Sequence, residues 1–134
     1  MEVIRKILGY TKIVMGNVID LLSVFVFKKQ KQKRSEDKLN ILVFNWRDLS
    51  HVWAGGAEVY IHELASRWVK DGNSVTIFCG NDKQSLRNEI VDGIQIVRRG
   101  GFYTVYAWAA LYYLLKFKRQ YDVIVDSENG VPFF

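Results

Sequence analysis

The sequence predicts an α/β protein with a Rossmann-like parallel sheet of about four strands, helices on its faces and an apolar, amphipathic helix in front. Two observations predict it. From Leu39 onward, short apolar runs alternate with longer stretches of helical periodicity, a pattern typical of βαβ units. Before that point, an apolar stretch ends in a run of lysines. We therefore divide the chain into residues 1–38, a helical segment with a polybasic linker, and residues 39–134, a partial Rossmann-like domain.

The composition favours a globular domain and excludes several classes of function. The chain has 134 residues, 49% of them hydrophobic, which is enough for a core. Its net charge of +5 is local, because residues 28–34 supply five cations and no anion, so we expect no nucleic-acid partner. Cys79 is the only cysteine, which excludes an intrachain disulfide and suits the cytosol. His51 and His62 lack carboxylates at a ligand spacing, so we expect no metal site.

The first segment is too short and too charged for a simple membrane span. Only fifteen residues separate Lys12 from Lys28, and Asp20 interrupts them, whereas a spanning helix needs about 20 apolar residues. No small-residue cleavage site follows the apolar stretch, which argues against a secretory signal. Two interpretations stay open: a helix at a membrane interface with its lysines at anionic headgroups, or a helix packed on the domain or on a partner chain.

The first βα unit follows. Residues 39–44 predict a strand buried on both faces, because they are almost continuously apolar. Residues 56–71 predict a helix that ends at Gly72 as a C-terminal cap. Its apolar positions fall on one side of a 3.6-residue period: Ala57, Ile61, Leu64, Ala65 and Trp68.

Three more strands and one helix are expected. Residues 74–79 and 94–98 predict the second and third strands, separated by an irregular polar stretch at 80–93. Residues 103–118 predict a helix covered on most sides, because it is uncharged through Leu115 and rich in aromatics. Residues 121–126 predict the fourth strand.

Candidate chemistry lies where strands end, because ligands of open parallel sheets bind beyond the carboxyl ends of the strands. Gly55 and Gly56 open the first helix, where free backbone N–H groups hold a phosphate or sugar oxygen; the alternative is a plain tight turn. Residues 126–132 carry Asp126, Glu128 and Asn129, which suit a sugar contact or a general base. The alternative there is a solvated turn before Pro132.

Two nucleotide-binding patterns are excluded. The Gly-x-Gly-x-x-Gly turn of dinucleotide-binding folds is missing, and the loop after the first strand is about ten residues long, too long for that fingerprint. Asp82 occupies a Gly-Asn-Asp turn rather than a ribose-binding position. No Gly-Lys-Ser or Gly-Lys-Thr occurs, which excludes a P-loop.

Residues 39–134 resemble the N-terminal domain of group 1 glycosyltransferases, also called glycosyltransferase family 4, which have the GT-B fold. Four segments carry the resemblance, in the order of the family: Asn45-Trp46-Arg47-Asp48; Ala54-Gly55-Gly56-Ala57-Glu58-Val59-Tyr60 with residues 63–65 and 71–76; Arg98-Arg99-Gly100-Gly101 with residues 104–106; and residues 121–126 with Asn129-Gly130-Val131-Pro132-Phe133-Phe134.

The resemblance implies a retaining hexosyltransferase that needs neither metal nor cofactor and takes a nucleotide sugar as its donor substrate. In this family the N-terminal domain mainly holds the acceptor, here a glycan or glycolipid, and a C-terminal domain holds the donor. By analogy, Gly55 and Gly56 would lie at the donor's diphosphate and sugar. The acceptor side would be bordered by Asn45, Asp48, Glu128 and Asn129. The resemblance gives no catalytic residue, because the family's later strands and catalytic-region histidine have no counterpart in residues 1–134.

We therefore expect a chain that transfers no sugar alone and that works with a C-terminal domain or a second chain. Its expected location is the cytoplasm, peripheral on the inner face of the membrane through residues 1–34. The alternative is a non-catalytic binding or scaffolding module that recruits a partner through the exposed edge of the fourth strand.

Overall fold

The computed structural model describes residues 1–26, 37–127 and 131–133, and the chain separates into two compact units, residues 1–30 and 31–134. The first unit contains one helix, α1 (Glu2–Val26). At about 1.5 Å per residue this helix is roughly 37 Å long. No helix in the described part of the chain is both long and apolar enough to cross a membrane.

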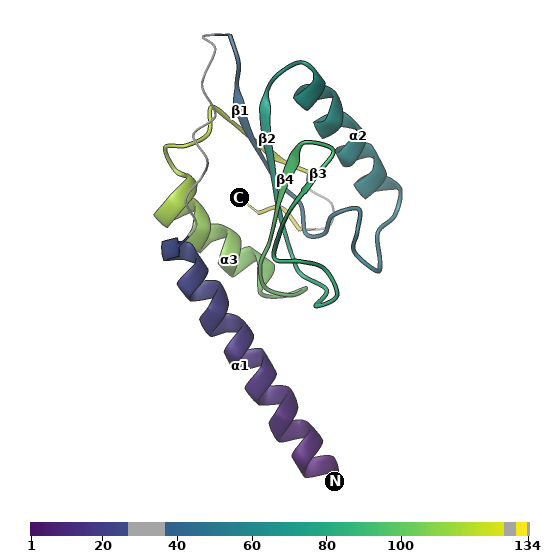
Figure 1. Ribbon diagram of the computed structural model, residues 1–134, viewed down its shortest axis with the longest axis vertical. Helices are drawn as coiled ribbons and strands as arrows, with labels where there is room; N and C mark the ends of the chain where they lie inside the picture. Colours follow the sequence, from purple (N-terminus) through teal and green to yellow (C-terminus); the bar gives the residue numbers. More distant parts are fainter. Residues whose placement is uncertain (27–36, 128–130, 134) are drawn as a thin grey trace. The chain divides into compact units, whose positions relative to one another are not determined.

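The second unit is an α/β layer structure built on one five-stranded sheet (Figure 1). The strands are β1 (Asn40–Phe44), β2 (Ser74–Cys79), β3 (Asn88–Val91), β4 (Ile94–Arg98) and β5 (Val123–Asp126), in the order β3-β4-β2-β1-β5. All neighbours pair in parallel except β3 and β4. The predicted Rossmann-like α/β fold is thus confirmed, with a fifth strand added.

The added strand, β3, lies in the stretch predicted to be irregular. It pairs with β4 through a tight turn at Asp92 and Gly93, whose φ angles are 51° and 78°. Positive φ at both central residues is the geometry of a type I′ hairpin turn, and Asp-Gly is a favoured sequence for it. The Asp92-Gly93 pair is thus a local sequence feature from which this hairpin could have been predicted.

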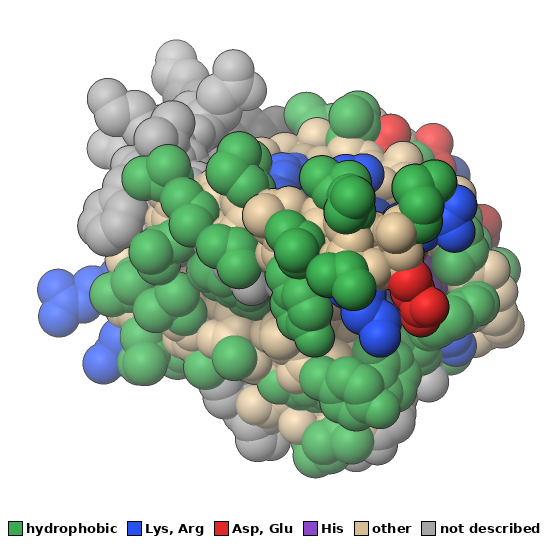
Figure 2. Space-filling view, turned by 90° about the horizontal axis from the view of Figure 1, so that it is seen from below, with side chains coloured by type: hydrophobic (Ala, Val, Ile, Leu, Met, Phe, Trp, Pro, Cys, Tyr) green, Lys and Arg blue, Asp and Glu red, His purple; other side chains and the backbone are tan. Residues whose placement is uncertain are grey.

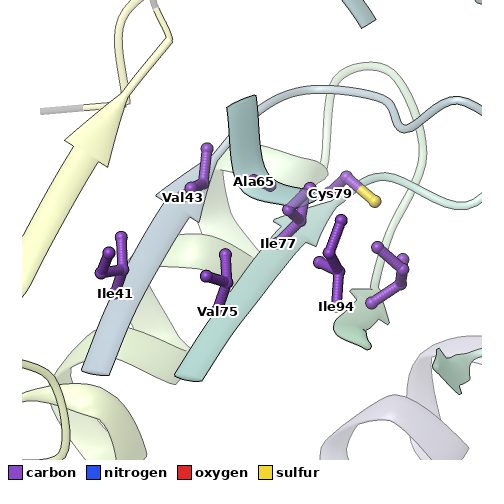
Figure 3. Packing of buried hydrophobic residues seen from close by; sticks show 8 residues of the cluster. Ile41, Val43, Ala65, Val75, Ile77, Cys79 and Ile94 are labelled. Carbon is purple, nitrogen blue, oxygen red and sulfur yellow. The ribbon is translucent and has the colours of Figure 1, made fainter. Parts of the chain in front are cut away.

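Helix α2 (Gly56–Lys70) covers one face of the sheet. The packed residues alternate along the strands, as a period of two requires, and Ala65 contributes from the helix (Figure 3). The predicted cap is confirmed: Gly72 has a φ of 89°, and its N–H donates to the Val69 carbonyl at 2.8 Å. The core of this face consists of Ile41, Val43, Ala65, Val75, Ile77, Cys79, Ile94 and Ile96.

The opposite face is covered by α3 (Val105–Tyr112), which continues as a short π-helix, η1 (Tyr113–Phe117). The Phe78 ring lies 5.3 Å from the Tyr112 ring and 6.0 Å from the Phe117 ring. The predicted helix at 103–118 is therefore present in two parts. It is covered on one side rather than on most sides, because Leu114 and Leu115 are 63% and 59% exposed.

The strand order places a switch point between β1 and β5, at one side of the sheet. From β1 the chain moves outward through β2 to β4 on one side, and then returns to add β5 on the other side of β1. In sheets of this kind the crevice beyond the carboxyl ends of the two strands at the reversal binds ligands. Here those strands are β1 and β5, which end at Phe44 and Asp126.

Candidate functional site

The loops that follow β1 and β5 are joined directly at the switch point. Asn45 follows β1 and is 1% exposed. Its side-chain carbonyl accepts a hydrogen bond of 2.9 Å from the Ser127 hydroxyl, and another of 3.1 Å from the Trp46 N–H. Asn45 thus stands at the expected crevice, where its oxygen holds the two loops in register. Its contact with an acceptor stays a prediction.

The glycine pair opens α2 on the same rim, and the residues around it hold the turn in place. Gly55 and Gly56 are exposed, and a Cβ built on Gly56 meets no atom within 4 Å. The Gly55 N–H donates to the Glu58 carboxylate at 2.6 Å, so a side chain of the same chain already satisfies this amide. The Gly56 N–H lies in the first helical turn, where no carbonyl of the helix can accept from it.

The side chain of Glu58 holds this turn in place. Its side chain is fully buried, and Arg47 Nε lies 2.9 Å from Glu58 Oε1, an ion-pair distance without hydrogen-bond alignment. A buried carboxylate needs a cation or several donors near it, and here Arg47 and the Gly55 N–H supply both. At the helix start, the N–H of Gly55 is therefore already bonded to Glu58, and Gly56 is the glycine that is left for a ligand.

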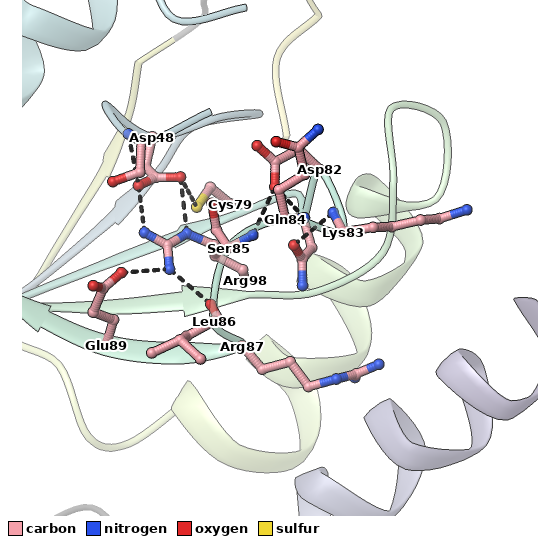
Figure 4. Close-up of polar contacts among 12 residues, drawn as sticks. Asp48, Cys79, Asp82, Lys83, Gln84, Ser85, Leu86, Arg87, Glu89 and Arg98 are labelled. Atoms are coloured by element: carbon pink, nitrogen blue, oxygen red, sulfur yellow. Dashed lines mark hydrogen bonds and ion pairs between the residues drawn. The ribbon is translucent and has the colours of Figure 1, made fainter. Parts of the chain in front are cut away.

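Asp48 lies in the same loop but is turned inward (Figure 4). Arg98 Nε and Nη2 donate to its two carboxylate oxygens at 3.0 and 2.7 Å. Asp48 and Arg98 are 6% and 1% exposed. Burial alone would raise the pKa of Asp48, but hydrogen bonding and attraction to Arg98 outweigh it and hold the pKa below its usual value. Asp48 thus positions the loop, and its role on the acceptor side stays a prediction.

Arg98 links Asp48 to a second loop, residues 80–87. Its Nη1 donates to the Leu86 carbonyl at 2.7 Å and to Glu89 at 2.8 Å. Although burial disfavours the charged guanidinium, its bonds to Asp48 and Glu89 raise the pKa of Arg98 above its ordinary value. Asp82 makes a further link, accepting from the N–H groups of Val52 and Gln84 at 3.2 and 2.9 Å. The rim is therefore a connected polar network.

Aromatic rings line this rim in a continuous series. Trp53, His51, Trp46, Phe102 and Tyr103 follow one another at centroid distances of 5.7, 5.8, 5.0 and 4.8 Å. Three of them are widely exposed: Trp53 at 64%, Phe102 at 52% and Tyr103 at 86%. We call these five residues the aromatic row. It joins the loop after β1, which also carries Gly55, to the loop after β4.

The two remaining predicted acceptor residues, Glu128 and Asn129, lie outside the described residues. Next to them, the Asp126 carboxylate accepts a 2.6 Å hydrogen bond from the Phe133 N–H. In the described ranges, no group of three or more His, Cys, Asp or Glu side chains is arranged to hold a metal. Of the predicted site residues, Asn45, Asp48 and Gly55 thus lie on the loop between β1 and α2, and Gly56 is the first residue of α2.

Sequence reasoning did not identify the pairing of Asp48 with Arg98, nor the burial of Arg99. Arg99 is fully buried and donates to the Tyr112 hydroxyl at 2.7 Å and to the Asn88 side-chain carbonyl at 3.0 Å. The pattern that points to both arginines is their place at the end of an apolar strand, because a charge on a buried strand needs a partner.

A comparison with protein-family models adds a finding that agrees with this geometry. The model of Glycosyltransferase Family 4 matches residues 54–133, which is more than half of the chain and includes the glycine pair, the arginine pair and β5. No curated protein and no solved structure matches the chain. The α/β fold, the switch point and the glycine-opened helix are consistent with the family match, and the chain belongs to glycosyltransferase family 4.

Proposed function

We propose that this chain is the acceptor-side part of a retaining glycosyltransferase that moves a hexosyl group from a nucleotide sugar to a lipid-linked or polysaccharide acceptor. The observation that carries the proposal is the exposed, unobstructed Gly56 at the start of α2, on the carboxyl rim of the sheet in a chain that belongs to this family. No metal and no cofactor takes part in the proposed reaction.

In the proposed reaction, the bond between the anomeric carbon and the diphosphate oxygen breaks while a bond from that carbon to an acceptor hydroxyl oxygen forms. The nucleotide diphosphate leaves with added negative charge, and the proton of the acceptor hydroxyl passes to the leaving diphosphate oxygen or to solvent. The Gly56 N–H and the positive end of the α2 dipole would offset that charge. Because Glu58 holds the Gly55 N–H at 2.6 Å, the turn would not need to reorganise as the charge develops.

The acceptor would lie along the aromatic row and the end of β1. Aromatic faces are large apolar surfaces that also tolerate polar edges, which suits the C–H faces and hydroxyl rims of a sugar. Trp53 and Tyr103 are the most exposed rings of the row, so we assign them the first contacts. Asn45, Asp48, Glu128 and Asn129 are proposed to border the same side.

The donor's remaining contacts are proposed to come from a C-terminal domain or a second chain, so that residues 1–134 alone transfer no sugar. A lipid-linked acceptor would place the reaction on the cytoplasmic face of a membrane, and the apolar and basic residues 1–34 favour that peripheral location.

The test is a transfer assay with labelled nucleotide sugars and with lipid-linked or polysaccharide acceptors. We expect no product from the chain alone, and product when a donor-binding polypeptide of the same family is added. Gly56→Val should abolish that product, because a branched side chain at the helix start blocks the approach of the diphosphate. Product from the chain alone would contradict the proposed need for a donor part. Transfer by the pair that is indifferent to Gly56→Val would contradict the assignment of the glycine.

A second candidate is a non-catalytic binding module that pairs with a partner through β5. Val123 and Ile124 of this strand are 38% and 43% exposed, and β5 is at one edge of the described sheet. An open strand edge invites pairing with another chain. A stable complex that forms without any nucleotide-sugar turnover, and that is lost in Ile124→Pro, would favour this candidate.

A further inference from the structure

Helix α1 separates its charged and apolar residues onto two faces. At about 100° per residue, the four charged residues whose side chains the structure describes, Glu2, Arg5, Lys6 and Lys12, fall within an arc of about 120°. Gly9 and Gly16 lie on the same side. The only described acid among them, Glu2, is 3.9 Å from Lys6, one turn along the helix. This face is therefore narrow and carries three cations, Arg5, Lys6 and Lys12; by the sequence, its acids are Glu2 and Asp20.

The other face is apolar along the helix except for Thr11, whose hydroxyl donates to the Leu8 carbonyl at 3.0 Å. Its described side chains fall within an arc of about 180°, which is wider than the two-residues-in-seven seam of a coiled coil. Within its own unit of the chain the face is uncovered. Hydrophobic side chains also form much of the surface seen in Figure 2, where acidic ones are few. The exposed members, each between 46% and 70% exposed, are Val3, Ile4, Ile7, Leu8, Tyr10, Val14, Met15, Val18, Ile19, Leu21 and Leu22.

The charge around this face matches an anionic surface. Residues 28–34 follow the helix directly in the sequence and contribute five cations and no anion. The helix itself adds three cations, Arg5, Lys6 and Lys12, against the two acids Glu2 and Asp20. Long basic side chains on the flank of an apolar face extend toward headgroups while their methylene stems stay in the apolar layer. A basic cluster next to an apolar helix is attracted to anionic lipids and is released by salt.

We propose that α1 lies in the plane of an anionic phospholipid bilayer, with its apolar face at the boundary of the acyl chains and the residue 28–34 cations on the headgroups. A helix with a wide apolar face opposite a basic one takes this orientation at a bilayer surface. The proposal deepens the peripheral location proposed with the function. It rests on that part of the proposed function alone, and no sugar transfer enters its test.

The experiment uses the full chain and sedimentation with sucrose-loaded vesicles of phosphatidylcholine, with or without 30% phosphatidylglycerol. The wild-type chain should bind the anionic vesicles at least tenfold more tightly than the neutral ones, and 0.5 M NaCl should weaken that binding at least fivefold. Equal binding to both vesicle types, or binding to neither, would overturn the proposal.

A matched pair of variants tests which face meets the lipid. Ile7→Gln with Val18→Gln places two amides at the centre of the apolar face, and should weaken anionic-vesicle binding at least tenfold. Gly9→Gln with Gly16→Gln introduces the same side chains on the opposite face of the same helix, and should change binding less than threefold. The reverse order of effects would overturn the proposed orientation.

Two further measurements keep the outcomes separate. Thermal unfolding of each variant in the absence of lipid should match the wild type, because the α/β unit, residues 31–134, is not altered. Light scattering gives the oligomeric state. An apolar-face variant that turns a dimer into a monomer, in a chain that binds no lipid, would show that a second copy covers α1 instead. A transfer assay that yields no product even with an added donor-binding polypeptide, while vesicle binding holds, would contradict the proposed function and leave the lipid contact standing.

Discussion

Arg98 donates two hydrogen bonds to the carboxylate of Asp48, from Nε to Oδ1 at 3.0 Å and from Nη2 to Oδ2 at 2.7 Å. These bonds connect the loop after β1 to the end of β4. The two residues are 50 positions apart in the sequence and almost completely buried. Bidentate contacts between Arg and a carboxylate fix orientation as well as distance. The loop they fix carries Gly55 and three rings of the aromatic row, and it leads into α2 at Gly56.

Removing one partner of this pair should destabilise the fold strongly. Asp48→Ala leaves a buried guanidinium with only its contacts to Glu89 and the backbone, and we expect a loss of about 3–5 kcal/mol in the free energy of unfolding. Glu89→Gln, on the more exposed side of the same guanidinium, should lose about 1 kcal/mol or less. Urea unfolding measures both. Equal losses would show that Asp48 has no special place in the network.

The same pair predicts how stability depends on acid. The pKa of Asp48 is lowered in the folded chain, so the unfolded chain takes up its proton first as the pH falls. The stability contributed by Asp48 is therefore complete above the unfolded pKa of about 3.9, and is lost as the pH falls through the folded value. Asp48→Asn should remove this dependence. The free energy of unfolding of both proteins is measured between pH 6 and 2.5. If it falls equally with pH in the wild type and in Asp48→Asn, the prediction is contradicted.

Glu58 should matter twice, as the acceptor for the Gly55 N–H and as the partner of Arg47. Glu58→Gln keeps an acceptor for the amide but loses the charge, whereas Glu58→Ala loses both. We expect about 1 kcal/mol of destabilisation for the first and about 2–3 kcal/mol for the second. Circular dichroism during thermal unfolding gives the comparison. Identical melting temperatures for the two variants would mean that the amide contact contributes nothing.

Lys116 predicts a second dependence of the same sign, at alkaline pH. Partial burial, with the nearby charge of Arg99, lowers its pKa from 10.5 to about 8. Between these values the unfolded chain holds more protons than the folded chain, so this group adds stability as the pH rises. Lys116→Met should therefore stabilise the protein at pH 7, and its advantage should shrink between pH 8 and 10.5. Lys118→Met, an exposed change of the same chemistry, is the control. A constant advantage for Lys116→Met across this range would contradict the pKa shift.

The elements that the sequence predicted correctly are those set by local pattern. Helix α2 and its Gly72 cap follow from apolar spacing and from one residue that tolerates positive φ. The hairpin at Asp92 and Gly93 was equally local, yet it was missed because β3 alternates exposed and half-buried residues and lacks an apolar run. Helix α3 was expected to be more covered than it is, because apolar composition alone does not show how many sides a helix buries.

The site was predictable in place but not in detail. The loop after β1 was identified because strand ends gather ligands and glycines open helices. Asp48 points inward because it pairs with Arg98, which is 50 positions later in the sequence, at the end of β4. No local sequence pattern indicates a pairing between residues so far apart. Gly55 and Gly56 looked equivalent in the sequence. Their difference arises from Glu58, three residues on, whose carboxylate takes the Gly55 amide.

The most direct measurement of the central claim follows the glycine amides by ¹⁵N NMR while inorganic pyrophosphate, and then nucleotide sugars, are added to the labelled chain. The account predicts that the Gly56 and Ala57 signals shift in a saturable way, that Gly55 moves less because Glu58 holds it, and that Gly72 at the far end of α2 stays still. Shifts confined to the basic residues, with Gly56 unmoved at saturation, would contradict the assignment of the helix start as the diphosphate site.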